Sequence, residues 1–431
     1  MLINITEIAL TIFVSLMLMA QLIALRFKVP YTVVLVFIGL GITALSTIVL
    51  STGPISTAFF GSIQWIKSLY EQLVSTGLFV GLIVPPLIFE AMIHIKRNEL
   101  STVIRPALAL ATVGVLLSTA VATLVLWKLA GLPLIIALIF AAIISPTDTI
   151  TVLQIFKHIK VPARLSTLME IEAAFNDATA IVLFSIILSS IGLEHSPFLF
   201  NYIGIFLYNF IVGGAIGIIV AYVARYIHTK VDDKMAETTL TIAAVYGSYV
   251  LATGIGASGL IAVAIVGLYF GSSTMRFAVS KSVRGAILSF WEIAAFVGNA
   301  IAFLFIGFET NLALFATAGA LIIVAFLSVV IARVATVYPI ISIFNRMSKK
   351  AKSKIPFKWA NIATLGGVRG ALSIALLATL VASNDISGSY ISTITTMVLG
   401  VVFISIIAQV PALSGYSSKL FGRHKKTTEL Q

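Results

Sequence analysis

The run Glu170-Ile-Glu-Ala-Ala-Phe-Asn-Asp177 places three carboxylates within eight residues of an otherwise apolar segment. Charged residues make up only 10% of the chain and hydrophobic residues 59%, so this cluster differs sharply from its surroundings. An ionised carboxylate costs roughly 3 kcal/mol at the centre of a bilayer on insertion scales, and ionisable residues kept there mark ion or proton pathways. The run therefore predicts a membrane-embedded ion or proton pathway.

The rest of the chain predicts an all-α polytopic membrane protein. Apolar stretches of about 20 residues recur along it, and each is long enough to cross a hydrocarbon core of roughly 30 Å. We expect about thirteen transmembrane helices, with bounds near 5–25, 29–50, 69–94, 102–129, 131–155, 166–192, 199–226, 235–253, 256–272, 284–308, 311–340, 357–382 and 388–416. No basic segment precedes the first stretch, so a cleaved signal peptide is not expected.

The positive charges predict the orientation of these spans. Most of the 28 lysines and arginines fall in alternate connections and in the C-terminal tail, and this side of a membrane protein faces the cytoplasm. The N-terminus is therefore expected outside a cell membrane and the C-terminus inside. The net charge of +12 then reflects a cytoplasmic face that attracts anionic lipid, and a nucleic-acid partner is not expected.

Several classes of function are unexpected for this composition. Cysteine is absent, which excludes disulfides, thiol catalysis and cysteine metal sites. No GxxxxGK[ST] motif occurs, so pumping driven by ATP is not expected. The five histidines fall in connections or at span ends, and no nucleophile–base pair or metal-ligand spacing appears. We therefore expect neither an enzyme nor a resident cofactor.

The fifth span contains Ser145-Pro-Thr-Asp-Thr149 within an apolar run. Pro146 removes a helix hydrogen bond and clashes with the preceding turn, so the helix is expected to break here. Unwound backbone at this depth is tolerated against protein or a water-filled cavity, where its carbonyls can coordinate ions. The alternative is a simple proline kink, which would leave Asp148 unexplained.

The twelfth span contains a second expected break, in Gly366-Gly-Val-Arg-Gly-Ala-Leu-Ser373. Three glycines within five residues weaken a helix. Arg369 could neutralise a buried carboxylate or lie against the negative C-terminal ends of broken half-helices. Close packing through small residues is the alternative reading of the glycines, but it does not account for Arg369.

The two breaks lie seven spans apart, on helices of opposite direction. This placement is typical of inverted repeats, here spans 1–6 and 8–13, with the broken helices crossing near the midplane of the membrane. Chance is the alternative, because glycine and proline are common in membrane helices.

The helical spacing of the opening run suggests a role for each polar residue. Ala173 and Asp177 share one face, while Glu172 and Asn176 share the adjacent face. Because Asp177 and Glu172 lie on different faces, Glu172 cannot easily satisfy Asp177, which is therefore placed to hold either a proton or a cation. We expect Glu172 to form a structural bridge with Arg369.

Two further charged residues have open interpretations. Glu90, in Pro85-Pro-Leu-Ile-Phe-Glu90-Ala, is either a carboxylate of the pathway or an interfacial glutamate. Arg333 in the eleventh span is either buried or extended to the cytoplasmic face. No role is predicted for Glu7, Glu71, Glu292 or Glu309.

Three of these motifs together resemble the monovalent cation/proton antiporters, and most closely the NhaP-type prokaryotic members of the sodium/proton exchanger branch. They are Ser145–Asp148, Glu172–Asp177 and Gly366–Ala371, and Pro85–Ala91 resembles a third-helix motif of that branch. The resemblance covers nearly the whole chain. It implies a transport bundle over 102–192 and 311–416, and scaffold helices over 5–94 and 199–308 that form a homodimer.

The resemblance also implies roles for individual residues. Asp177 would be the ion and proton carrier with Asn176 its neighbour, Thr147 and Asp148 would line the Na⁺ site, and Glu90 would shape the cytoplasmic funnel. Family members often carry Ser or Gly where Ala173 stands, so one ligand must come from a carbonyl, water or another residue.

The expected function is exchange of Na⁺, and of Li⁺ as a further cation, for H⁺ by alternating access. A single carboxylate, with Asn176 where the electrogenic branch has a second aspartate, predicts one proton per cation. The alternatives are a K⁺/H⁺ antiporter, a cation channel, which would usually show a filter or pore ring, and a sodium-coupled solute symporter. Proton flux measured on addition of each cation discriminates among them.

Overall fold

The computed structural model describes residues 5–27, 29–50, 65, 68–69, 72, 78–95, 97–156, 159–191, 199–274, 279–309, 312–348, 354–383 and 386–422. These residues are overwhelmingly helical, which confirms the predicted fold class. Seven of the described helical segments are long and apolar enough to cross a membrane, and shorter apolar helices lie between them. The total of thirteen spans stays a prediction.

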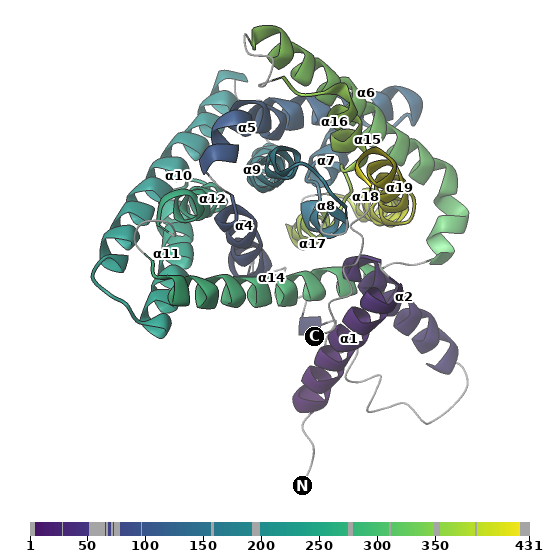
Figure 1. Ribbon diagram of the computed structural model, residues 1–431. Coiled ribbons are helices and arrows are strands. Elements are labelled where there is room, and N and C mark those ends of the chain that lie inside the picture. The colour runs from purple at the N-terminus through teal and green to yellow at the C-terminus, as the bar shows by residue number, and fades with distance from the viewer. Residues whose placement is uncertain are drawn as a thin grey trace.

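The described helices form an array with α8, α9 and α17 in its interior, and α1 and α2 project from one side of it (Figure 1). The N-terminal helices are α1 (Ile5–Phe27), α2 (Tyr31–Leu50), α4 (Val84–Ile93), α5 (Arg97–Ala109), α6 (Val115–Leu129), α7 (Leu134–Ile144), α8 (Thr149–Phe156) and α9 (Ala163–Ser189). After α10 (Leu199–His228) come α11 (Lys234–Gly254), α12 (Gly259–Tyr269), α14 (Lys281–Glu309), α15 (Leu312–Met347), α16 (Phe357–Leu365), α17 (Ala371–Ser383), α18 (Gly388–Ile404) and α19 (Val410–Phe421). Short π-helical turns over Phe79–Ile83, Leu110–Gly114, Phe270–Thr274 and Ser405–Gln409 join or extend several of these helices.

Both predicted helix breaks are present. The fifth expected span is divided into α7 and α8, with residues 145–148 unwound between them, and the twelfth into α16 and α17, with the break at 366–370. The two unwound segments touch, because the backbone N–H of Asp148 donates to the carbonyl of Val368 at 2.7 Å. The breaks therefore cross each other inside the protein.

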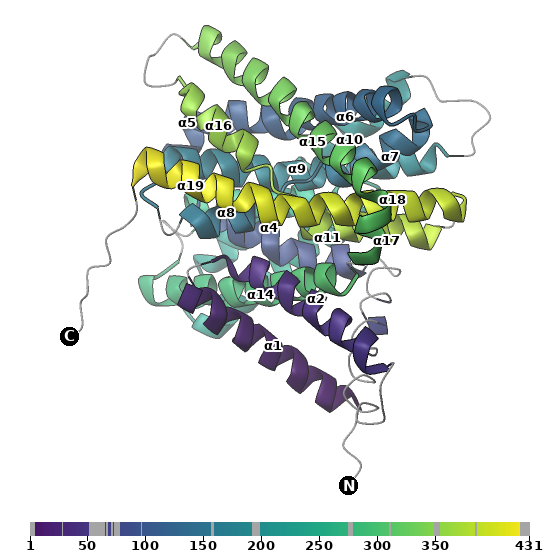
Figure 2. The same cartoon turned by 90° about the vertical axis from the view of Figure 1, so that its right-hand side faces the viewer.

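The helices pack in two neighbourhoods around this crossing. The long helix α14 packs against α2, α4 and α11, while α12 packs against α4, α10 and α11. On the other side α15 packs against α6, α16 and α18, and α9 packs against α5 and α7. Figure 2 shows α1, α2 and α14 on one side of the molecule, with α18 and α19 running across its middle.

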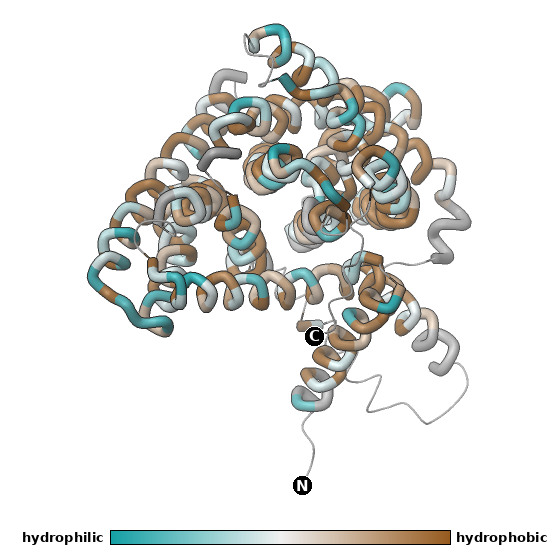
Figure 3. Tube along the Cα trace, viewed as in Figure 1, coloured by the Kyte–Doolittle hydropathy of each residue, from teal (hydrophilic) through white to brown (hydrophobic). Residues whose placement is uncertain are grey.

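The outer faces of the array are apolar. Leu10, Leu18 and Leu22 of α1 and Ile211 and Ile219 of α10 are all exposed. Apolar residues cover much of the outer helices in Figure 3. Exposed leucine and isoleucine in such density suit contact with lipid tails rather than water.

Candidate functional site

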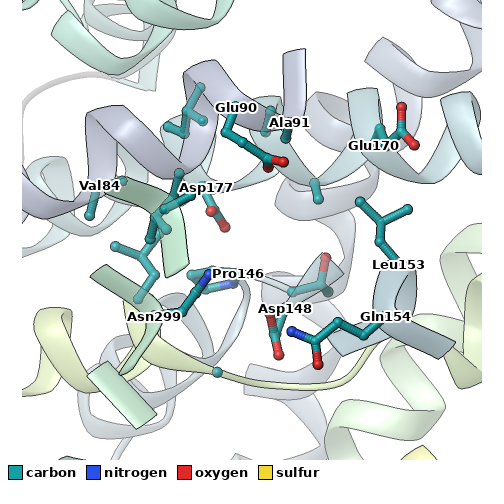
Figure 4. Close-up of a pocket in the computed structure, with 18 of the residues that line it drawn as sticks. Val84, Glu90, Ala91, Pro146, Asp148, Leu153, Gln154, Glu170, Asp177 and Asn299 are labelled. Atoms are coloured by element: carbon teal, nitrogen blue, oxygen red, sulfur yellow. The ribbon is translucent and has the colours of Figure 1, made fainter. Parts of the chain in front are cut away.

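A cavity of about 410 Å³ lies beside the crossing of the two breaks. Its walls come from α2, α4, α8, α9, α14, α17 and the unwound residues of both breaks. Figure 4 shows that Glu90, Asp177 and Asn299, from three different helices, and Asp148, from the first break, converge on it. The cavity also reaches His94, which ends α4 at the expected cytoplasmic side.

Asp177 lies in α9 and lines this cavity together with Ala173, one turn earlier on the same face. Its Oδ1 is buried and has no hydrogen-bond partner among the described residues. Burying a carboxylate oxygen without a partner is costly, so this atom favours a bound proton or cation. Because Ala173 has no hydroxyl, it adds only a methyl group at this wall.

Asn176 and Thr147 are in direct contact. The Asn176 side-chain amide donates to Thr147 Oγ1 at 3.0 Å, which joins α9 to the first break. Asn176 is fully buried and does not line the cavity, whereas Thr147 does. The contact holds the Thr147 hydroxyl beside the space that Asp177 faces.

Asp148 lines the cavity and immediately precedes α8. Its Oδ1 accepts the backbone N–H of Thr151 at 3.5 Å, as an N-cap does, and its Oδ2 accepts the Thr151 hydroxyl. The side chain is 8% exposed. Asp148 therefore has both a structural partner and access to the cavity.

Glu90 projects from α4 into the same cavity, and its role in the ion pathway stays a prediction. Its Oε1 lies 3.6 Å from Nε2 of His94, one turn along the helix. Glu170 and Glu292 also line the cavity, although no role was predicted for Glu292. Within the described part of the chain, five carboxylates thus surround a space that a cation could enter.

Asn299 is a cavity residue that the sequence analysis missed. It lies in α14, is 3% exposed, and its Oδ1 has no hydrogen-bond partner among the described residues. A single asparagine in an apolar helix has no neighbouring motif to distinguish it from a packing residue. The only feature of the sequence that could have pointed to Asn299 was a polar side chain within a predicted apolar span.

The predicted bridge between Glu172 and Arg369 is wrong. In the described residues Glu172 Oε1 pairs with Nη2 of Arg333, at 2.8 Å. Arg369 instead donates through Nη1 to the carbonyls of Ser145 and Pro146, at 2.7 and 3.0 Å. The break after α7 exposes these carbonyls beside Arg369, at the C-terminal end of a broken half-helix, which was the alternative partner that the sequence analysis considered.

Arg333 is buried rather than extended to the membrane surface, with 5% of its area exposed. Besides its ion pair, Nη2 donates to the carbonyl of Ala363 near the end of α16, at 3.2 Å. Each broken span thus has an arginine against the C-terminal end of its first half, Arg369 at α7 and Arg333 at α16. Both cations offset the negative ends of the helix dipoles.

Comparison with known proteins gives a consistent family match. The family model described as "Sodium/hydrogen exchanger, transmembrane" matches residues 11–415. The Na(+)/H(+) antiporter NhaH of Halobacillus aidingensis is 30% identical over 411 residues, covering 92% of this chain and 94% of that protein. The Na(+)/H(+) antiporter NhaP of Pseudomonas aeruginosa is 33% identical over 314 residues, covering 69% and 71%.

Other relatives are longer than this chain. The Na(+)/H(+) antiporter ApNhaP of Aphanothece halophytica is 31% identical over 353 residues, and the match covers 81% of this chain but only 62% of that protein. The chain thus spans less than two thirds of the length of that relative. Among solved structures, the sodium proton antiporter MjNhaP1 of Methanocaldococcus jannaschii has the same fold, with a TM-score of 0.74 over 97% of this chain and 21% sequence identity.

Proposed function

This chain belongs to the sodium/hydrogen exchanger family, and we propose that it exchanges Na⁺ for H⁺ across the cell membrane. The observation that carries the proposal is the Asp177 carboxylate. Its Oδ1 is buried and unpartnered among the described residues, and the side chain faces a cavity at the crossing of two broken helices. Such a group can bind one proton or one cation.

Competition for Asp177 would couple the two fluxes. An empty, ionised Asp177 cannot cheaply move through an apolar barrier, whereas a protonated or cation-loaded one is neutralised. With a proton or a cation bound, the site can then open to the other side of the membrane. Exchange therefore needs no separate sensor for each ion.

The other oxygen ligands of the cation would come from the first break. Asp148 and the Thr147 hydroxyl line the cavity, and Asn176 orients that hydroxyl through its amide. Sodium favours hard oxygen ligands of this kind. Water or carbonyl oxygens would take the place of the hydroxyl that Ala173 lacks, and Glu90 would draw cations into the cavity.

A single competing carboxylate implies one proton per cation. Each transport half-cycle then carries a neutralised site, so net exchange moves no charge. The same ligands also suit Li⁺, which we include as a second substrate. Potassium is the rival cation because oxygen ligands suit it as well.

Alternating access would be a movement of the bundle over 102–192 and 311–416 against the scaffold over 5–94 and 199–308. The cavity reaches His94 and Val161, near connections expected in the cytoplasm, which supports a cytoplasm-facing state. We further propose that two copies pair through scaffold helices, with N-termini outside and C-termini in the cytoplasm.

Proton flux in proteoliposomes tests this function. Purified protein is reconstituted with a pH-sensitive dye inside, and NaCl, LiCl, KCl or choline chloride is added outside. We expect Na⁺ and Li⁺ to drive proton movement and choline to drive none. A response to K⁺ alone would assign a K⁺/H⁺ antiporter, and cation flux without proton flux would contradict exchange.

A further inference from the structure

Two buried threonines connect the Asp148 carboxylate to a helix outside the broken span. Thr151 of α8 donates its hydroxyl to Asp148 Oδ2. The same hydroxyl oxygen lies 2.9 Å from Oγ1 of Thr32 in α2. Both threonine side chains are fully buried, so water does not compete for these bonds.

When Asp148 is ionised, the proton count sets the direction of each hydrogen bond. An ionised carboxylate can only accept, so the single hydroxyl proton of Thr151 goes to Asp148. The Thr151 oxygen can then only accept from its other neighbour, and Thr32 must donate to it. The order Thr32 to Thr151 to Asp148 therefore matches an ionised Asp148, the form that would contribute to cation binding.

The chain of bonds crosses between two sets of helices. Thr32 lies in the first turn of α2, which packs against α14 and α1. Thr43 of the same helix donates to the carbonyl of Phe308 in α14. Thr151 lies in α8, which packs against α9 and α19. In the proposed mechanism α2 belongs to the scaffold and α8 to the moving bundle.

We propose that Thr32 is a positioning residue for cation binding, acting through Thr151 on the Asp148 carboxylate. Thr32 fixes the Thr151 hydroxyl, and that hydroxyl together with the Thr151 N–H fixes the two oxygens of Asp148. The contact exists only while α2 and α8 are adjacent. The scaffold thus orders the site for cations in this conformation and releases it when the bundle moves.

This inference rests on the proposed exchange activity, and transport kinetics provide its first test. Thr32→Val keeps the shape of the side chain and removes the hydroxyl, whereas Thr32→Ser keeps the hydroxyl. We expect Thr32→Val to raise the apparent KM for Na⁺ roughly two- to tenfold, the range for one lost hydrogen bond, with kcat changed less. Thr32→Ser should restore the wild-type KM.

Thr43→Val is the matched control. It removes a hydroxyl from the same helix, one that lies against the carbonyls of Gly39 and Phe308, three turns along α2 from Thr32. Its KM should equal that of the wild type. An unchanged KM in Thr32→Val, equal effects of Thr32→Val and Thr43→Val, or no rescue by serine would overturn the inference.

A double-mutant cycle in detergent tests the relay, meaning the hydrogen bonds from Thr32 through Thr151 to Asp148, without any transport. Thr32→Val, Thr151→Val and the double variant are compared by thermal unfolding. Because Thr32 acts through Thr151, the double variant should be about as stable as Thr151→Val alone. Additive losses would overturn the relay. A wild-type protein that shows no exchange would refute the proposed function, while this cycle would still decide the relay.

Discussion

Arg333 Nη2 lies 2.8 Å from Glu172 Oε1, and the pair joins α15 to α9 with both side chains almost sealed from solvent. The same guanidinium group reaches the carbonyl of Ala363 near the end of α16. One arginine therefore connects the Glu172 carboxylate to the second helix break. This links the helix that carries Asp177 to the geometry of the crossing.

Breaking this ion pair on one side should cost more stability than removing both charges. Glu172→Gln and Arg333→Gln each leave an uncompensated buried charge, a loss of about 3–5 kcal/mol in free energy of unfolding. The double variant leaves no such charge and should be more stable than either single variant. Thermal or denaturant unfolding in detergent measures the difference.

Two comparisons control this cycle. Arg346→Gln removes an exposed arginine from the same helix and should change stability by less than about 1 kcal/mol. Combining Glu172→Gln with Arg369→Gln should give a smaller coupling, because Arg369 donates to the carbonyls of Ser145 and Pro146. A stronger coupling to Arg369 than to Arg333 would contradict the assignment.

Gly370 should tolerate no side chain, because the two breaks touch there. A Cβ at Gly370 would lie 2.6 Å from Cβ of Asp148 and 3.0 Å from its Cγ, so Asp148 would have to move. We expect Gly370→Ala to lower kcat/KM for Na⁺ by at least about tenfold, with an overpacking cost of about 1–3 kcal/mol in stability. Proton flux in proteoliposomes measures the loss.

Gly319→Ala is the control for that substitution. Gly319 lies inside α15 and an added Cβ would meet no atom within 4 Å, so alanine should be neutral or stabilise the helix by up to about 1 kcal/mol. Full activity in Gly370→Ala would mean that the close contact with Asp148 has no role in transport.

Exchange through one carboxylate should be electroneutral. Clamping the membrane potential of proteoliposomes with valinomycin and K⁺ should leave the rate of Na⁺/H⁺ exchange unchanged over both polarities. A rate that rises or falls with potential would argue against one proton per cation. It would direct attention to Asp148 and Glu90, which line the same cavity, as carriers of a second proton.

The sequence alone predicted the parts of this fold that depend on local chemistry. Pro146 and the glycines at 366, 367 and 370 disfavour helix whatever surrounds them, and both breaks occur where these residues stand. The motifs also predicted that Asp177, Thr147 and Asp148 would lie together, and the structure brings them to one cavity.

The sequence could not predict which of two similar side chains a buried residue contacts in the folded protein. Two arginines lie in neighbouring spans, and spacing along α9 does not show which one Glu172 faces. The outcome depends on where the carbonyls of Ser145 and Pro146 point after the break, since they bind Arg369 and leave Glu172 to Arg333. The role of Thr32 is likewise visible only once α2 and α8 are placed side by side.

The central claim is that Asp177 is the group on which proton and cation compete, and its replacement by asparagine tests this most directly. The matched control is Glu170→Gln, which neutralises another carboxylate of α9 that lines the same cavity. Glu170 already accepts a hydrogen bond from the Ser166 hydroxyl, at 2.8 Å. Both variants are purified, checked for folding by size-exclusion chromatography, and assayed for Na⁺-driven proton flux in proteoliposomes. We predict that Asp177→Asn abolishes the flux while Glu170→Gln retains it; sustained exchange by a folded Asp177→Asn protein would contradict the account.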